Sequence, residues 1–248
     1  MHALLLKIPV AILLSLGLLG CATNGDLRDP LEPLNRSIYK FNDVVDKAVL
    51  KPVARGYKEA MPDPARTAIG NFFSNLDDVL VLLNDLLQLK IDQSASDFSR
   101  LVWNTSVGIA GLIDVATPMD LPKHNEDFGQ TLGYWSVGNG PYLVLPFLGP
   151  STLRDTVGTV VDTHFDPVAQ HTPVPERNSA IAIDTVDTRS RLLDAEKVLD
   201  EAAIDRYVFL RDAYLQRRRG LVYDGNPPRE KFEDDEDPAP AKPAASRP

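Results

Sequence analysis

The histidines of this chain are its first candidates for metal binding. His164, Asp166 and His171 lie close together and carry side chains of the types that ligate transition metals. They fall within residues 164–175, which contain three prolines. Such a segment lacks the helical geometry that places two histidines four residues apart on one metal. The spacing therefore favours a polar loop over a metal site.

His124, close to Glu126 and Asp127, is the other group that could take part in proton transfer. A polar loop between two elements accounts for the same residues. The chain has no G-x-S-x-G motif, and Gly138-Asn139-Gly140 lacks the third glycine and the following helix of a phosphate-binding loop. The sequence thus predicts no catalytic residue, no metal and no cofactor, and indicates that the protein is not an enzyme.

Cys21 is the only cysteine, and its position predicts chemistry of another kind. Lys7 precedes a charge-free run of twelve residues, Ile8–Leu19, and Gly20 comes directly before the cysteine. This order is typical of an export signal, and the run is shorter than the roughly 20 residues that span a bilayer. The alternative is an ordinary signal peptide that ends by chance in a cysteine. That alternative leaves a lone cysteine in an exported chain without a disulfide partner.

The segment Leu18-Leu19-Gly20-Cys21 resembles the lipobox of bacterial lipoproteins, although Leu19 stands where Ala, Ser or Thr is commoner. The resemblance implies signal cleavage between Gly20 and Cys21. It also implies a thioether-linked diacylglycerol on the Cys21 sulfur and an acyl chain, such as palmitate, on the new α-amine. Each buried methylene contributes roughly 0.8 kcal/mol, so several chains anchor a protein almost permanently. Ala22, where an aspartate would retain a lipoprotein in the inner membrane, favours the outer membrane.

The charge of the chain argues against several partners. The formal net charge is −9, and removal of residues 1–20 takes away only Lys7, which brings it to −10. Nucleic-acid binding depends on Lys and Arg that neutralise phosphates, so we expect none. Attraction to anionic lipid is not expected to be the main force at a membrane. No stretch after Cys21 is apolar enough to cross a membrane as one helix.

The periodicity of apolar residues predicts an all-α protein. Apolar residues recur at steps of three and four over residues 34–49, which indicates an amphipathic helix that Lys51-Pro52 ends. Ser151 or Thr152 is expected to cap a later helix, and Asp205 is expected to cap the last one. Gly220 is expected to stop that last helix.

Two segments, Val79–Leu89 and Leu101–Ile113, are apolar on more than one side of the helices they are expected to form. A break between Asn75 and Asp78 is expected to separate the first of them from the helix before it. A helix without a clear polar face is either fully buried or lies in lipid. Both interpretations stay open in a chain that carries a membrane anchor.

The segment Phe128–Pro150 is rich in glycine and proline, with Tyr134, Trp135, Tyr142 and Phe147 among them. We expect turns and a hairpin-like loop there, and no helix. One interpretation is a tightly packed turn region with aromatic anchors. The other is a mobile amphipathic loop beside a lipid path, where Tyr and Trp suit the membrane–water interface.

A series of short motifs extends along the chain. The first comprises Asp29, Pro30, Asn35, Arg36, Phe41 and Asn42. The others are Asn104–Gly108, Gly111–Ala116, Phe128–Gly133, Gly138–Tyr142, Leu145-Pro146 and Gly149–Asp155. In order and spacing these motifs resemble the MlaA/VacJ family of outer-membrane lipoproteins, over about residues 29–220. Asn35, Phe41 and Asn42 either line a pore or pack the first helix, and for Phe41 we expect packing.

The resemblance implies a ring-like helical protein in the inner leaflet of the outer membrane, with an amphipathic channel at its centre. Family members take phospholipids that have strayed into the outer leaflet and pass them to a soluble periplasmic carrier, which maintains lipid asymmetry. They also associate with trimeric porins. On this basis residues 1–20 are a signal peptide, 21–29 a lipidated tether, 30–225 the helical domain, and 226–248 a disordered acidic, Pro/Ala-rich tail.

The glycine-rich loop is the expected gate of such a channel. Its candidate residues are Gly133, Gly138, Gly140, Pro141 and Tyr142. Flexing of this loop would admit or release lipid, so Gly140→Pro is expected to slow transfer without unfolding the protein.

Two other functions remain as alternatives. A structural lipoprotein that supports a porin would carry no phospholipid through purification. A lipid-modifying hydrolase would lose activity, but not its fold, when His124, His164 and His171 are replaced together.

Overall fold

The computed structural model describes residue 26 and residues 28–229 of the chain. Residues 1–25, which include Gly20 and Cys21, and the tail beyond residue 229 lie outside the described residues. The elements are α3 (Glu32–Val45), a π-helical turn (Asp46–Leu50), α4 (Lys51–Ala60), α5 (Asp63–Leu87), α6 (Ile91–Ser106), a 3₁₀ turn (Thr117–Met119), α7 (Phe128–Tyr134), β1 (Tyr142–Leu145), β2 (Gly149–Thr152), α8 (Leu153–Phe165), α9 (Val174–Ala202) and α10 (Arg206–Val222).

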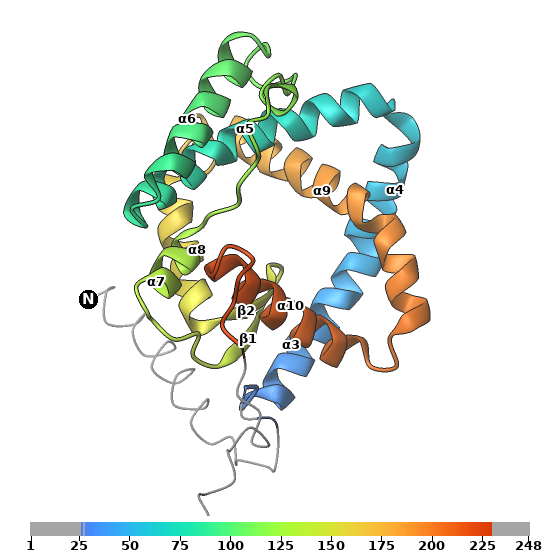
Figure 1. Cartoon of the computed structure of the whole chain (residues 1–248). Coiled ribbons are helices and arrows are strands. Elements are labelled where there is room, and N and C mark those ends of the chain that lie inside the picture. The colour runs from blue at the N-terminus through green and yellow to red at the C-terminus, as the bar shows by residue number, and fades with distance from the viewer. Residues whose placement is uncertain (1–25, 27, 230–248) are drawn as a thin grey trace, which may run out of the picture.

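The helices are arranged as a ring (Figure 1). α3 and α4 form one side, α5 and α6 continue it, and α7 with α8 leads back to the hairpin, which packs against α3. α9 lies against α4 and α5, and α10 lies against α7 and β2. In the hairpin, β1 and β2 pair antiparallel, with Tyr142 opposite Thr152 and Leu145 opposite Gly149. The expected all-α, ring-like fold with a hairpin-like loop is confirmed.

The distribution of polarity is reversed from that of a water-soluble protein. Among the described residues, twenty-two polar or charged residues are buried, against nine hydrophobic ones. α5 shows this most clearly, because Asn75, Asp78, Asn84 and Asp85 are all at most 5 % exposed. Leu86, on the same helix, is 49 % exposed. The polar face of this helix therefore points into the protein and its apolar face points out.

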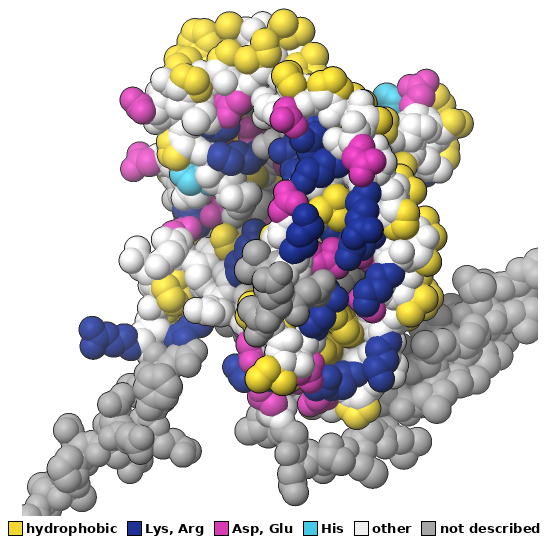
Figure 2. All heavy atoms as spheres, turned by 90° about the vertical axis from the view of Figure 1, so that its right-hand side faces the viewer, with side chains coloured by type: hydrophobic (Ala, Val, Ile, Leu, Met, Phe, Trp, Pro, Cys, Tyr) yellow, Lys and Arg dark blue, Asp and Glu magenta, His cyan; other side chains and the backbone are white. Residues whose placement is uncertain are grey.

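Apolar side chains cover the outer surface of the α5–α6 pair. They include Leu87, Leu89, Ile91, Phe98, Val102, Trp103, Val107, Ile109 and Ile113, each more than a third exposed. In Figure 2, hydrophobic side chains gather at the top of the molecule, and Lys and Arg gather below them. Exposed apolar patches of this extent mark contact with a membrane or a partner. The interpretation that Val79–Leu89 and Leu101–Ile113 are fully buried is therefore wrong.

No helix in the described part of the chain combines the length and the apolar character needed to cross a membrane.

The first helix does not end at Lys51-Pro52, contrary to the sequence prediction. α3 continues through the π-helical turn Asp46–Leu50 into α4, in which Pro52 is the second residue. A π-helical turn widens the backbone, so the missing N–H of a proline does not force the helix to end there.

The expected break between Asn75 and Asp78 is also absent, because α5 is continuous from Asp63 to Leu87. Asn75 and Asp78 do not cap a new helix, since tertiary partners take up their side chains. The Asn75 amide donates to the Thr105 hydroxyl at 3.0 Å, and Lys123 pairs with Asp78.

Other expectations about helix ends had mixed outcomes. Thr152 caps α8 and Asp205 caps α10, as predicted. α10 runs past Gly220 to Val222, so the predicted stop was wrong. α7 contradicts the prediction of no helix within Phe128–Pro150, because Asp127 caps it by accepting from the Gln130 amide at 2.8 Å. Leu101–Ile113 is helical only as far as Ser106.

Candidate functional site

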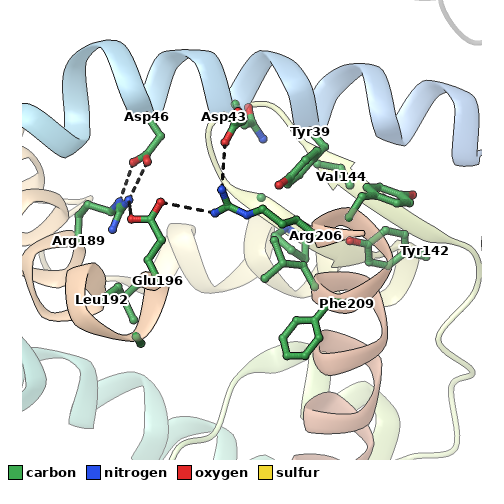
Figure 3. A pocket seen from close by; sticks show the side chains of 16 residues that line it. Tyr39, Asp43, Asp46, Tyr142, Val144, Arg189, Leu192, Glu196, Arg206 and Phe209 are labelled. Atoms are coloured by element: carbon green, nitrogen blue, oxygen red, sulfur yellow. Dashed lines mark hydrogen bonds and ion pairs between the residues drawn. The ribbon is translucent and has the colours of Figure 1, made fainter. Parts of the chain in front are cut away.

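A pocket of about 470 Å³ lies between α3, the hairpin, α9 and α10 (Figure 3). Part of its wall is apolar and aromatic, and comes from Tyr39, Tyr142, Val144, Leu192 and Phe209. Tyr142 and Val144 are buried at the base of the hairpin and belong to the hydrophobic core cluster with Tyr207. This core therefore forms the base of the pocket on the hairpin side.

A network of ion pairs between the first helices and α9 forms another part of the pocket wall (Figure 3). The Arg189 guanidinium on α9 contacts both carboxylate oxygens of Asp46, at 2.7 and 2.8 Å, and Glu196 at 2.6 Å. Lys51 donates to Glu196 at 2.9 Å. Burial alone would raise the pKa of Glu196, but hydrogen bonds from Arg189 and Lys51 lower it to about 2. Glu196 is therefore charged throughout the physiological pH range.

The family-signature asparagines of α3 hold the hairpin. The Asn35 amide donates to the Tyr142 carbonyl at 3.0 Å and accepts from the Val144 amide at 2.9 Å. About two helical turns later, Asn42 donates to the Leu145 carbonyl at 2.9 Å and accepts from the Phe147 amide at 2.8 Å. α3 thus pairs with the free edge of β1 through side chains instead of a backbone ladder.

The remaining signature residues surround the same contact. Asp29 is buried, and accepts from Asn35 at 2.8 Å and from the Tyr207 hydroxyl at 2.5 Å. Phe41 packs edge-to-face against Phe147, with ring centroids 5.3 Å apart. Arg36 pairs with Glu32 at 2.6 Å and Asp205 at 2.9 Å, while its guanidinium lies over the Tyr207 ring. Pro30 precedes α3.

The residues of the predicted gating loop are spread over several elements. Gly133 lies within α7, Gly138 and Gly140 lie in the connection to the hairpin, and Tyr142 begins β1. Gly140 has a φ of +65°. Proline requires a φ near −65°, so the Gly140→Pro test of gating would strain the backbone whatever the loop does. Gating by this segment stays a prediction.

The histidines do not gather into a site. His124 pairs through Nδ1 with Asp97 at 2.8 Å, and Asp127 pairs with Arg218. His171 pairs with Glu176 at 3.1 Å, near the start of α9. Within residue 26 and residues 28–229, no cluster of three or more His, Cys, Asp or Glu side chains is placed to hold a metal.

A buried pair of carboxyl groups is the feature that sequence reasoning missed. Asp85 on α5 and Asp97 on α6 are both fully buried. Neither carboxylate oxygen of Asp85 accepts a hydrogen bond from a donor in the described part of the chain. Burial, followed by the neighbouring Asp97, raises the pKa of Asp85 to about 8. The signal in the sequence was an aspartate inside the apolar run Val79–Leu89.

Comparison with known proteins identifies the family to which this fold belongs. The sequence profile described as "MlaA lipoprotein" matches residues 27–221, which is most of the chain. The chain belongs to the MlaA lipoprotein family. Its relatives include the protein named "Intermembrane phospholipid transport system lipoprotein MlaA" of Escherichia coli (strain K12), which is 38 % identical over 233 residues. That alignment covers 88 % of this chain and 92 % of the relative.

Another protein of the MlaA family and a solved structure are also similar to this chain. The protein of the same name from Haemophilus influenzae is 34 % identical over 228 residues, with 88 % of this chain and 91 % of the relative covered. A solved structure from work on the "Structural basis for maintenance of bacterial outer membrane lipid asymmetry" superposes with a TM-score of 0.69 at 36 % identity, and covers 80 % of this chain and 99 % of the other. The MlaA family is a family of lipid-transport lipoproteins and not of enzymes. The alternative that this protein is a lipid-modifying hydrolase is therefore wrong, and the protein is not an enzyme.

Proposed function

We propose that this protein transports phospholipids as part of an intermembrane transport system and thereby maintains the lipid asymmetry of the outer membrane. The observation that carries the proposal is the reversed polarity of the fold, with apolar side chains outside α5 and α6 and polar side chains within. An apolar exterior can lie among acyl chains, whereas a headgroup moving through the ring needs polar partners, because burying it unpaired costs several kcal/mol. The names of the MlaA relatives support the same activity.

In this proposal Cys21 delivers and orients the body, which lies in the inner leaflet of the outer membrane. Phospholipids from the outer leaflet enter the ring and leave toward a periplasmic carrier, and a trimeric porin is the partner at the membrane. The hairpin, restrained by Asn35 and Asn42, is the movable wall of the path. The arrangement supports this because β1 carries side chains of the pocket and its free edge is held to α3 by those asparagines.

Mass spectrometry of the mature protein purified in gentle detergent tests the proposal. We expect diacylglycerol and an acyl chain on Cys21 and phospholipid bound to the protein. Protein without any bound phospholipid would favour the structural role beside a porin. Cys21→Ala is expected to fail first in sorting, because the anchor delivers the protein while the apolar surface shares its retention.

Tryptophan fluorescence tests the membrane contact directly. The chain has two tryptophans, Trp103 and Trp135, and both are exposed, at 43 % and 57 %. Their emission is expected to fall by at least half when the protein is placed in bilayers whose phospholipids carry bromine on the acyl chains. The physical reason is that bromine quenches only on close approach. Trp103 belongs to the apolar surface, and Trp135 lies next to it, because its indole donates to the Leu87 carbonyl at 3.1 Å.

The variants Trp103→Phe and Trp135→Phe assign the quenching to each ring. Headgroup-labelled quenchers serve as the control for depth. Emission that responds to a water-soluble quencher, and not to brominated chains, would place this surface outside the membrane.

A further inference from the structure

The segment that leads from the predicted lipid anchor is bonded directly to the hairpin. The Arg28 carbonyl accepts from the amide of Tyr142, the first residue of β1, at 3.1 Å. Farther along the same edge of β1 the asparagines of α3 take over, beginning with Asn35 at the Tyr142 carbonyl and the Val144 amide. The edge of β1 that faces away from β2 is therefore shared between α3 and the segment that follows the anchor.

Asp29 fixes this segment in place. The side chain is 2 % exposed, and its two oxygens accept from the Asn35 amide at 2.8 Å and from the Tyr207 hydroxyl at 2.5 Å. The Arg211 guanidinium lies 3.6 Å from Asp29 and 3.1 Å from Asp26, and so offsets the buried charge. One carboxylate thus joins the segment to α3 and α10 together, which holds the backbone before it beside β1.

The chain from the anchor to this contact is short. Seven chain steps lead from Cys21 to Arg28, and an extended chain spans at most about 3.6 Å per residue. The Arg28 carbonyl therefore lies within about 25 Å of the sulfur that is predicted to carry the lipid. The start of β1, where Tyr142 forms part of the pocket wall, is kept near the membrane surface that holds the anchor.

We propose that Asp29 is a positioning residue for the hairpin, and that Asp26, Arg28 and Asp29 form a tether clamp on the movable wall of the transport path. While the tether clamp is closed, the first residue of β1 is held and the hairpin stays against α3. Release of the clamp frees that residue, so the hairpin opens more often and phospholipid leaves faster. This inference rests on the proposed transport function and adds to it a residue that controls the hairpin.

Hydrogen exchange of the mature, acylated protein in mild detergent tests the tether clamp. Tyr207→Phe removes the hydroxyl that bonds Asp29 but keeps the ring, which packs edge-to-face on Tyr142 with centroids 6.3 Å apart. We expect exchange at the Tyr142 amide to rise about tenfold, the effect of losing one hydrogen bond. Exchange at the Asp155 amide, which donates to the Thr152 hydroxyl at the start of α8, should change by less than about twofold.

Three further variants distinguish the clamp from a general loss of stability. Asp29→Ala removes both bonds of the carboxylate and should raise exchange at the Tyr142 amide at least as much as Tyr207→Phe does. Asp29→Asn keeps an oxygen for Asn35 and an amide for the Tyr207 hydroxyl, so it should retain most of the protection. Tyr223→Phe, which removes an exposed hydroxyl at the C-terminal cap of α10, is the matched control and should exchange as the unmodified protein does.

Lipid transfer measures the functional consequence of the clamp. The protein is loaded with pyrene-labelled phosphatidylethanolamine, and the label is followed as it moves to vesicles of phosphatidylcholine. Transfer should be faster from Tyr207→Phe and Asp29→Ala than from the unmodified protein, because an unclamped hairpin opens the path more often. Tyr223→Phe should transfer at the unmodified rate.

Each contrary result has one meaning. Unchanged exchange at the Tyr142 amide in both Tyr207→Phe and Asp29→Ala overturns the clamp, while co-purified phospholipid still supports transport. Equal rises at the Tyr142 and Asp155 amides show a general destabilisation and also overturn it. A local rise without faster transfer overturns the control of transport by the clamp. An unmodified protein that neither retains nor transfers phospholipid overturns the transport function, and with it the role of the clamp in transport, whatever the exchange rates.

Discussion

Replacement of Asp85 by asparagine is expected to stabilise the folded protein by about 5 kcal/mol at pH 8 and to change its stability little at pH 4. Asp85 is fully buried beside Asp97. Burial first, and the neighbouring Asp97 next, raise the pKa of Asp85 from 3.8 to about 8. The asparagine amide retains a donor toward Asp97 and has no charge to bury.

The direction of the pH dependence follows from the two states. In the unfolded chain Asp85 loses its proton near its ordinary pKa of 3.8, whereas in the folded protein it keeps the proton up to about pH 8. Between these values the unfolded state binds fewer protons, so the free energy of unfolding falls as the pH rises. This contribution is lost in Asp85→Asn, and the difference between the two proteins therefore grows with pH.

Thermal unfolding followed by circular dichroism in mild detergent, at several pH values from 4 to 8, measures this difference. Asp92→Asn, which removes an exposed carboxylate near the start of α6, is the control and should give a shift that hardly varies with pH. A destabilisation by Asp85→Asn that is equal at pH 4 and pH 8 would contradict a protonated Asp85.

The second large effect is expected at Asn35, where alanine should cost about 3 kcal/mol of stability. The side chain is 1 % exposed and serves three partners: the Asp29 carboxylate, the Tyr142 carbonyl and the Val144 amide. Alanine leaves all three buried without a hydrogen bond, and unpaired buried groups carry the full desolvation cost. Asn35→Asp should be no better, because a carboxylate cannot donate to Asp29 or Tyr142.

Asn42→Ala separates the stability of the fold from the motion of the hairpin. Asn42 holds the turn of the hairpin at the more exposed end of the contact, so alanine should cost about 1 kcal/mol of stability. Hydrogen exchange at the Phe147 amide should rise at least tenfold, and lipid transfer should change with it if the hairpin is the gate.

Ser37→Ala on the exposed side of α3 is the control for both asparagine variants, because its hydroxyl donates to the local Pro33 carbonyl of the same helix at 2.9 Å. Denaturant unfolding and peptide-level hydrogen exchange measure the effects. If Asn35→Ala and Ser37→Ala unfold alike, the asparagines do not hold the hairpin.

Much of the helical framework was predictable from local patterns. The helix over residues 34–49, the hairpin-like loop, and the caps at Thr152 and Asp205 follow from periodicity and from short-range hydrogen bonds. Two of the predictions that were wrong concern breaks in helices, at Asn75–Asp78 and Lys51-Pro52. There a distant partner or a π-helical turn outweighs the local signal.

The candidate site was beyond local patterns, because its contacts join residues far apart in the chain. Asp46 and Arg189 are separated by 143 positions and meet only when α9 packs on the first helices. Asn35 and Asn42 were recognised as signature residues, but their role depends on the position of β1 beside α3. Nothing in the spacing of α5 and α6 residues indicates that Asp85 and Asp97 face each other.

By itself, the sequence predicts an export signal and a lipid anchor, and it determined the helical class and the family, because each depends on local periodicity or on short motifs in order. Only the tertiary structure decided which way the amphipathic helices face. The same periodic pattern fits an apolar face turned inward in water or outward in lipid, and the choice depends on which face finds partners. Here Asn75 and Asp78 of α5 bind Thr105 and Lys123, and Gln88 at its C-terminal cap binds Glu126, so the apolar face is left on the outside.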